Sequence, residues 1–409
     1  MKNICKLIIF ILLFLPLFVY AEDFTISSQH AILYNLNDDK VIYDKDSNEK
    51  TSIASLTKIT TAIVAIENIK DLDSKVTITK DDYQGIYEAN LATAGFQVGE
   101  EVTYRDLLYG LLLPSGAEAA QALANNIAGG NSEFVELMNK KAKELKLKNT
   151  HYTNTTGLDD NNHYSTAKDV ATVFKYAINN KDFKEIIESS KYTTSNKRLT
   201  LSSSVSRNIQ SNNLGIDYIL GGKTGTTEDA GLCLATIAKE NKVNYLLVTT
   251  GVPIDNRGEQ FQDHKIIYDY FINNYAYHNV VNKKDLLTSI KTLYIKQDKI
   301  NFYAPKIITM YLNNSFSKDK LKYKYHGKDL ITTKMKKGEK LGKVDIYYEN
   351  KLLTTIDIIL QEKPKLDIIK FLNGHKISII VLLLIIILIV LIRRKKKIKI
   401  KVKKKKRLK

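Results

Sequence analysis

The chain has 409 residues, a hydrophobic fraction of 44% and a formal net charge of +18. This length favours two domains, and the hydrophobic fraction excludes overall disorder. Because residues 393–409 hold 13 Lys and Arg and no acid, the rest of the chain is nearly neutral, which argues against a basic nucleic-acid-binding domain.

A secretory signal is the first predicted element. Residues 2–6 carry two lysines, residues 7–19 are apolar and uncharged, and Val19 and Ala21 supply the small residues that a signal peptidase recognises. We expect a signal peptide over 1–21, with cleavage after Ala21. An uncleaved N-terminal anchor is the alternative, although the apolar run is short for a membrane span.

Residues 22–277 combine strands with helices. β-Rich runs on either side of polar turns predict two hairpins, at 30–43 and 232–250. Apolar residues at helical spacing predict helices over 55–68, 104–127 and 261–274, the second of them broken around Pro114. Hairpins at both ends of a helical middle indicate an α+β fold, in which helices cover one antiparallel sheet.

The remaining segments predict a small domain and a membrane anchor. Short β-rich stretches with polar breaks indicate an all-β domain over 278–365, in which we find no residues that would carry chemistry. Residues 377–392 are uncharged and apolar on every face, so we expect a transmembrane helix over 372–392 rather than a buried core helix. The basic tail, 393–409, is expected to stay in the cytoplasm, which makes this a single-pass protein of the cell membrane with its domains outside. A nucleic-acid-binding tail is the alternative.

The first of three chemical motifs is Ser55-Leu56-Thr57-Lys58, which places a serine and a lysine on one face of a helix near its N-terminus. A serine hydroxyl needs an adjacent base to act as a nucleophile. A lysine serves as that base only when burial or a second cation lowers its pKa. Ser-x-x-Lys also occurs by chance in chains of this length, so the motif alone decides nothing.

The other two motifs supply the second cation and a second hydroxyl. In Lys223-Thr224-Gly225, the lysine adds positive charge, the threonine offers a hydroxyl to a carboxylate, and the glycine leaves a strand open to a peptide. Pro114-Ser115-Gly116-Ala117 lies between two helical stretches, where Ser115 is a candidate proton relay. Taken singly, the first of these motifs is better explained as a Gly-rich turn into a strand, and the second as a plain helix-to-helix turn.

Together, the motifs have the order S-x-x-K, S-D-N, K-T-G found in penicillin-binding proteins and class A β-lactamases. Over nearly its whole length the chain resembles the low-molecular-weight penicillin-binding proteins of peptidase family S11, which are D-alanyl-D-alanine carboxypeptidases. Further stretches that carry the resemblance are Ile53–Lys58, Ala94-Gly95 with Val98-Gly99, Asp106–Leu112, Thr156-Gly157-Leu158, His163–Ala167 with Asp169, Gly222–Thr226 and Ala230–Leu234. The resemblance implies a β-lactamase/DD-peptidase-like catalytic domain over 22–277.

The resemblance also implies catalytic roles. Ser55 is the acylated nucleophile, Lys58 is its base, and Ser115 relays a proton. The implied reaction removes the terminal D-alanine from peptidoglycan stem pentapeptides through an acyl-enzyme on Ser55, and β-lactam antibiotics are the implied covalent inhibitors. This chemistry needs no cofactor and no metal, and the few histidines show no metal-ligand spacing.

Substrate binding is implied at four neighbouring positions, and a fifth candidate lies further along the chain. Lys223, Thr224, Gly225 and Thr226 match the family's third motif, and the backbone N–H groups of Ser55 and Thr226 are implied to form the oxyanion hole. Arg257 is the nearest candidate for an arginine that holds the substrate carboxylate, but it lies a few residues early in the chain and is equally consistent with a solvated loop charge.

One departure from the family pattern concerns the middle motif, which normally ends in Asn where this chain has Ala117. Loss of one polar contact of this kind costs about 10²–10³ in rate. Either another group substitutes, with Asn125 and Asn126 as candidates about two helical turns further on, or the activity is low.

Three other functions remain open from the sequence. A β-lactamase would need a glutamate-driven water from an E-x-x-L-N type loop, and none lies between Ser115 and Lys223. A DD-endopeptidase of the same family would share all three motifs. A low-activity or non-catalytic wall-binding homologue is suggested by Ala117.

Overall fold

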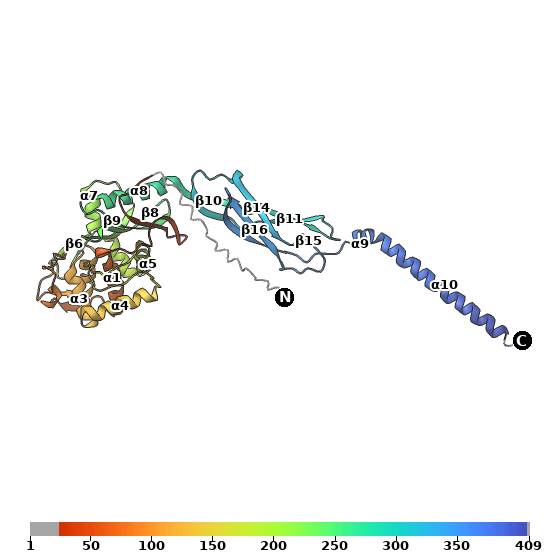
Figure 1. Cartoon of the computed structure of the whole chain (residues 1–409), viewed down its shortest axis with the longest axis horizontal. Coiled ribbons are helices and arrows are strands. Elements are labelled where there is room, and N and C mark those ends of the chain that lie inside the picture. The colour runs from red at the N-terminus through yellow and green to blue at the C-terminus, as the bar shows by residue number, and fades with distance from the viewer. Residues whose placement is uncertain (1–23, 407–409) are drawn as a thin grey trace, which may run out of the picture. The chain divides into compact units, whose positions relative to one another are not determined.

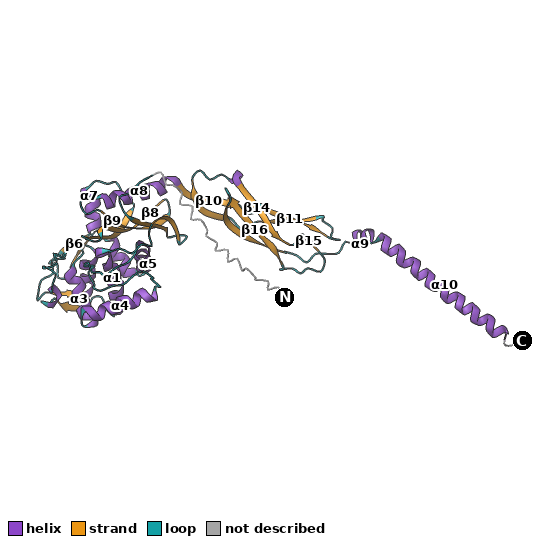
Figure 2. Ribbon diagram, in the orientation of Figure 1, coloured by secondary structure: helices purple, strands orange, loops and turns teal. Residues whose placement is uncertain are grey.

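The structure, a computed structural model, describes residues 24–406, so the predicted signal peptide lies outside the described residues. The chain divides into two compact units between Asn273 and Asn274. Figure 1 shows the elements of both units, and Figure 2 distinguishes their helices from their strands.

The first unit contains one five-stranded antiparallel sheet in the order β2-β1-β9-β8-β7. Its strands are β1 His30–Asn35, β2 Lys40–Lys45, β7 Ile219–Thr227, β8 Gly231–Glu240 and β9 Val243–Val252. Both predicted hairpins are present, as β1–β2 and β8–β9. The predicted α+β class is confirmed, because helices lie on both faces of this sheet (Figure 1).

Eight α-helices lie among the described residues of the first unit. They are α1 Thr57–Asn68, α2 Tyr104–Leu112, α3 Ala117–Ala128, α4 Asn131–Glu144, α5 Ala167–Ala177, α6 Lys181–Glu188, α7 Ser204–Ser211 and α8 Glu259–Asn274. Two small ladders join β3 Lys75–Thr77 to β4 Glu101–Thr103, and β5 Lys191–Thr193 to β6 Thr200–Ser202. Helices α7 and α8 lie on one side of the sheet and α1 and α5 on the other (Figure 1).

Helix α1 is the centre of the hydrophobic core. It is buried from Thr57 to Ile66 and packs against α2, α3, α4, α5 and α6. Apolar residues therefore occur on most of its faces, as expected for a helix surrounded by protein. Such a helix is a rigid support for side chains at its N-terminal end.

The second unit begins with an all-β domain, as predicted. Its strands are β10 Tyr275–Val281, β11 Leu286–Thr292, β12 Lys299–Tyr303, β13 Ile308–Asn313, β14 Leu321–Gly327, β15 Leu330–Ile331, β16 Lys340–Tyr348 and β17 Lys351–Ile359. They form the ladders β10-β13, β12-β11-β15 and β14-β16-β17 around a separate apolar core.

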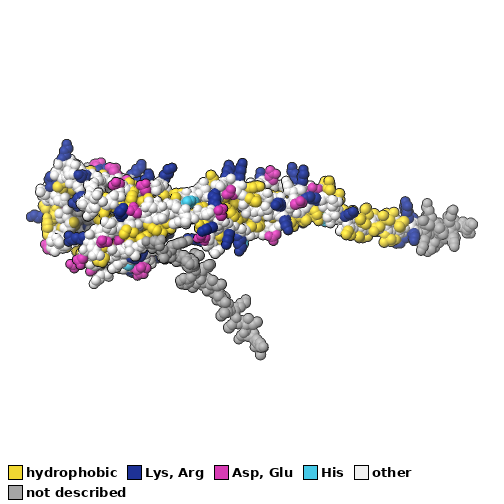
Figure 3. Space-filling view, turned by 90° about the horizontal axis from the view of Figure 1, so that it is seen from above, with side chains coloured by type: hydrophobic (Ala, Val, Ile, Leu, Met, Phe, Trp, Pro, Cys, Tyr) yellow, Lys and Arg dark blue, Asp and Glu magenta, His cyan; other side chains and the backbone are white. Residues whose placement is uncertain are grey.

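Two helices follow the β domain. Helix α9, Ile368–Gly374, is short, and helix α10, Lys376–Lys406, contains the apolar run. Its segment Lys376–Lys397 is long and apolar enough to cross a membrane, with a mean hydropathy of 3.0 and no burial inside the protein. Figure 3 shows the hydrophobic side chains of this segment on the surface. Leu372, the first residue of the predicted transmembrane helix, lies in α9.

Candidate active site

Ser55 lies on a single 3₁₀ turn, Ala54–Leu56, that leads directly into α1. Ala54 has a φ of +47°, a left-handed conformation that alanine adopts at a cost of about 1–2 kcal/mol. Strand β7 passes beside this turn, because a Cβ on Gly225 would lie 3.2 Å from the Ser55 nitrogen. Glycine at this position therefore allows the strand to approach the serine closely.

Lys58 lies one helical turn after Ser55 and points back toward it. Its Nζ lies 2.9 Å from Ser55 Oγ and donates to the Thr156 carbonyl oxygen at 2.8 Å. The side chain is only 2% exposed, and burial lowers the pKa of Lys58 to about 7, although the negative charge of Glu118 acts in the opposite direction. A lysine with this pKa is able to take a proton from a serine near neutral pH.

Ser115 and Lys223 form a second serine–lysine pair. Lys223 Nζ donates to Ser115 Oγ at 2.8 Å, and the lysine side chain is fully buried. Burial, followed by the positive charge of Lys58, holds the pKa of Lys223 well below its usual value. Ser115 has a φ of +74°, a strained conformation of the kind that clusters at functional sites.

The rest of β7 presents polar side chains in alternation. Thr224 is half-buried, and its hydroxyl lies 2.9 Å from the hydroxyl of Ser204 at the start of α7. Thr226 is exposed. Arg257 is exposed in the loop before α8 and takes part in none of the hydrogen bonds or ion pairs found among residues 24–406. Its role in carboxylate binding stays a prediction.

The position of the missing amide, Ala117, is completely buried at the start of α3. The structure gives both candidate substitutes other partners: Asn125 donates to Asp82 at 2.7 Å, and Asn126 donates to the Ala122 carbonyl at 2.8 Å. The Thr156 carbonyl is instead the acceptor that Lys58 uses besides Ser55. Neither asparagine therefore replaces the amide that the family motif normally supplies.

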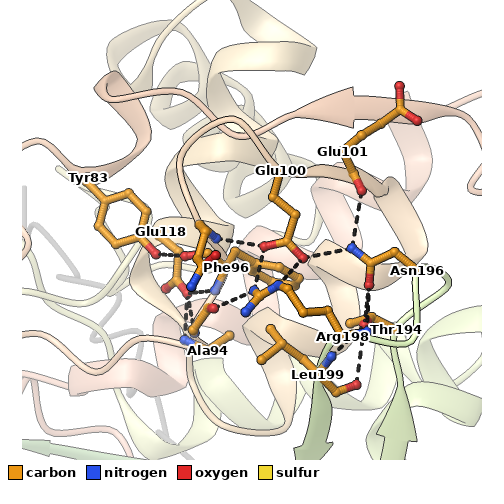
Figure 4. A network of polar contacts seen from close by, with 12 residues as sticks. Tyr83, Ala94, Phe96, Glu100, Glu101, Glu118, Thr194, Asn196, Arg198 and Leu199 are labelled. Atoms are coloured by element: carbon orange, nitrogen blue, oxygen red, sulfur yellow. Dashed lines mark hydrogen bonds and ion pairs between the residues drawn. The ribbon is translucent and has the colours of Figure 1, made fainter.

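Sequence reasoning missed two contributors to the site. Thr156 acts through its backbone carbonyl, which no side-chain pattern reveals, although Thr156-Gly157-Leu158 is one of the stretches that resemble the family. Glu118 follows the middle motif and is completely buried, and Figure 4 shows its carboxylate facing the backbone of Ala94 and Phe96. Its sequence signal is an acidic residue directly after Ala117, and its burial is visible only in the structure.

Gly157 keeps the Thr156 carbonyl close to the nucleophile, and its replacement gives a testable prediction. Its φ is +84°, and a Cβ there would lie 1.9 Å from the Ala54 oxygen and 3.0 Å from the Ser55 nitrogen. Gly157→Ala should displace the nucleophile turn and lower the rate of acylation of Ser55 about 10²-fold, the cost of a displacement near 1 Å.

Gly129→Ala is the matched control for this change. Gly129 has a φ of +85° at the end of α3, and a Cβ there would meet no atom within 4 Å. Both variants carry the same left-handed strain, and Gly157→Ala should lose more thermal stability than Gly129→Ala because its Cβ also meets the Ala54 oxygen. Equal acylation rates in the two variants would show that the contact with Ala54 does not matter.

Comparisons with known proteins agree with this geometry. Residues 18–253 match the family model of peptidase S11, D-alanyl-D-alanine carboxypeptidase, and residues 275–365 match the penicillin-binding protein 5 C-terminal domain. The chain is 29% identical to the D-alanyl-D-alanine carboxypeptidase DacF of Bacillus subtilis strain 168, over 83% of this chain and 86% of that protein. It is 28% identical to DacC of Escherichia coli K12, over 86% and 89%.

Solved structures show the same fold. Penicillin-binding protein 5 from Haemophilus influenzae matches with a TM-score of 0.62 and 24% identity, over 83% of this chain and 98% of that chain. The Streptomyces K15 DD-transpeptidase matches with a TM-score of 0.55 and 29% identity, over 60% of this chain and 97% of that chain. From the family match over more than half its length, the chain belongs to the peptidase S11 family of D-alanyl-D-alanine carboxypeptidases, which are serine-type hydrolases.

Proposed function

We propose that the protein removes the terminal D-alanine from peptidoglycan stem pentapeptides through an acyl-enzyme on Ser55. The observation that carries this proposal is the Lys58–Ser55 contact of 2.9 Å, made by a lysine whose pKa burial brings to about 7. A neutral amine held against a serine hydroxyl is the activated-nucleophile arrangement that acyl transfer requires.

The first half of the reaction forms the acyl-enzyme. Neutral Lys58 takes the Ser55 hydroxyl proton as Oγ attacks the carbonyl carbon of the penultimate D-alanine. The backbone N–H groups of Ser55 and Thr226 are the proposed donors to the oxyanion. The C–N bond then breaks, and the proton that Lys58 took from Ser55 passes through Ser115, whose hydroxyl is held by Lys223, to the leaving amine, which returns Lys58 to its neutral form. Free D-alanine departs.

The second half hydrolyses the ester. Water attacks the acyl carbon while Lys58 accepts one of its protons, and the ester C–O bond breaks as Ser55 Oγ recovers a proton. The same lysine thus acts as base in both halves. A β-lactam that enters the site would acylate Ser55 by the same attack, with its ring nitrogen as the leaving group, and would remain bound when hydrolysis of its ester is slow.

The carboxylate of the substrate is proposed to bind beside β7. Lys223 and Thr224 lie on β7 next to the nucleophile turn, and β7 is the edge strand of the sheet, where an extended peptide can add as a further strand. Because Arg257 is exposed in a loop, the hydroxyl of Thr224 carries more of this recognition in our proposal than an arginine does.

Carboxypeptidase activity is favoured over endopeptidase activity. The matching proteins that cover most of this chain are named carboxypeptidases, whereas the D-alanyl-D-alanine endopeptidase of Pseudomonas aeruginosa matches only 36% of it. Mass analysis of a stem pentapeptide and of a cross-linked dimer, each incubated with the protein, separates the two. Loss of one D-alanine from the pentapeptide is expected, and cleavage of the dimer alone would contradict the proposal.

Helix α10 is proposed to anchor the protein in the cell membrane, with the catalytic domain outside and the 393–409 tail in the cytoplasm. The apolar segment Lys376–Lys397 supports a single crossing, and the density of Lys and Arg beyond it supports this orientation. Protease treatment of intact protoplasts should digest the first unit and spare an epitope tag on the tail. Digestion of the tag instead would reverse the topology.

A further inference from the structure

Glu118 is a buried carboxylate beside the active site that the proposed reaction does not use. It lies in the first turn of α3, three residues after Ser115, and is 0% exposed. Its Oε1 accepts backbone hydrogen bonds from Ala94 at 2.7 Å, Gly95 at 2.9 Å and Phe96 at 3.4 Å. Its Oε2 is buried and has no hydrogen-bond partner among residues 24–406. Burial raises the pKa of Glu118, and the backbone hydrogen bonds from Gly95, Ala94 and Phe96 act in the opposite direction, so its charged form depends on these contacts.

The three residues that Glu118 binds belong to a segment, Ala94–Gln97, that we name the strap. Figure 4 shows the strap held from its other side as well. Arg198 donates to the Gly95 carbonyl at 2.6 Å, the Tyr83 hydroxyl donates to the Phe96 carbonyl, and the Gln97 nitrogen donates to Glu100 at 2.7 Å. The strap is therefore fixed between Glu118 and a set of peripheral groups.

The strap lies directly against the Ser115 turn. A Cβ on Gly116 would lie 2.8 Å from Ala94 Cβ and 2.9 Å from the Ala94 nitrogen, and the Ala117 nitrogen donates to the Ala92 carbonyl at 2.8 Å. Since Ser115 holds a left-handed backbone conformation, it needs surroundings that maintain this conformation. Glu118 ties the strap to the same helix that carries this turn.

The charged groups near Glu118 also link it to the active site. Lys58 and Lys223 are both buried in the site, and Glu118 raises the pKa of Lys58 against the larger effect of burial. Tyr83 is the other titratable group that Glu118 affects, and burial chiefly raises its pKa. On the elements packed against α3, Asp82 is bound by Thr79 and Asn125, and Glu100 is paired with Arg198.

We propose that Glu118 is a positioning residue for the serine–lysine site: its carboxylate holds the strap against the Ser115 turn and places a negative charge that favours the protonated form of Lys58. The inference rests on the proposed function of the site. Removal of the negative charge should destabilise the protonated form of Lys58, so the lysine becomes neutral at lower pH. The active form of the base would then persist into more acidic conditions.

Glu118→Gln tests the charge, because the amide has the same size and its oxygen can still accept from the strap. In the pH profile of acylation by fluorescent penicillin, the rise on the acid side (the acid limb) should shift to lower pH by roughly one unit. Glu136→Gln makes the same chemical change on an exposed residue of α4 and should leave the limb in place. An unshifted limb in Glu118→Gln would overturn the proposed role of its charge.

Glu118→Asp tests the positioning separately. It keeps the charge but shortens the side chain by one methylene, so the acid limb should stay near that of the wild type. The plateau rate should fall about tenfold, since the carboxylate no longer reaches the strap and small displacements at such sites are costly. A wild-type plateau in this variant would show that the contact with the strap has no part in the reaction.

Titration of the Lys58 ammonium by ¹⁵N NMR, in the wild type and both variants, gives a second readout that does not depend on acylation. It should show a lower pKa in Glu118→Gln and a nearly unchanged pKa in Glu118→Asp. A wild type that forms no penicillin adduct would contradict the proposed function. The titration would still decide the electrostatic role of Glu118, so the two failures are distinguishable.

Discussion

Replacing Ser55 with alanine is expected to abolish covalent penicillin binding and to lower kcat for D-alanine release by at least about 10⁴-fold. Ser55 is the only protein group in the proposed mechanism that forms a covalent bond to the substrate. Lys58, Ser115 and Lys223 remain in place in the variant, but none has an acyl acceptor to activate. Fluorescent penicillin followed by gel electrophoresis measures the adduct, and D-alanine release from a pentapeptide measures the rate.

Ser52→Ala is the matched control for this variant. Ser52 lies three residues earlier, is half-buried and belongs to the same short segment before α1. Its hydroxyl has no part in the proposed reaction, so this variant should label with penicillin and release D-alanine at rates near those of the wild type. Normal labelling of Ser55→Ala would contradict the account, since it would place the adduct on another residue.

Lys58→Arg is expected to lower the acylation rate by about 10²–10⁴-fold, the usual contribution of a general base. The guanidinium keeps a positive charge near Ser55 but is not deprotonated in proteins, so it cannot take the serine proton. Exposed Lys70, just after α1, provides the matched control, and Lys70→Arg should have no effect. An active Lys58→Arg variant would show that the lysine serves only as a charge.

The same base predicts the pH dependence of the wild type. Lys58 acts when it is neutral, and burial brings its pKa to about 7. The acylation rate should therefore rise about tenfold per pH unit below pH 7 and level off above it. A flat profile between pH 5 and 8 would contradict a lysine base, and Lys58→Met should remove the slope together with the activity.

Much of the fold was predictable because its signals are local. The β1–β2 and β8–β9 hairpins consist of apolar runs around polar turns, and α1 has apolar residues at helical spacing from Leu56 to Ile66. The local signal misleads at residues 292–295, whose composition favours a strand. There β11 ends at Thr292, Leu293 and Tyr294 form a bend, and Ile295 makes an isolated bridge with Leu366.

The site was predictable where its residues form motifs. Ser55 with Lys58 and Ser115 with Lys223 are each in hydrogen-bond contact, and the second pair joins residues that are 108 positions apart in the chain. The Thr156 carbonyl and Glu118 were not predictable in the same way. A backbone carbonyl has no residue-type signature, and a glutamate in the first turn of a helix is ordinarily a solvated group that favours the helix dipole.

Covalent labelling followed by peptide mapping tests the central claim most directly. Trypsin releases Ser55 in the peptide from Thr51 to Lys58, because lysines flank that segment. After exposure to benzylpenicillin, intact-mass analysis should show one adduct per chain, and fragmentation of this peptide should place it on Ser55. An adduct at Ser52, at Ser115 or in any other peptide, or no adduct at all, would contradict the acyl-enzyme mechanism.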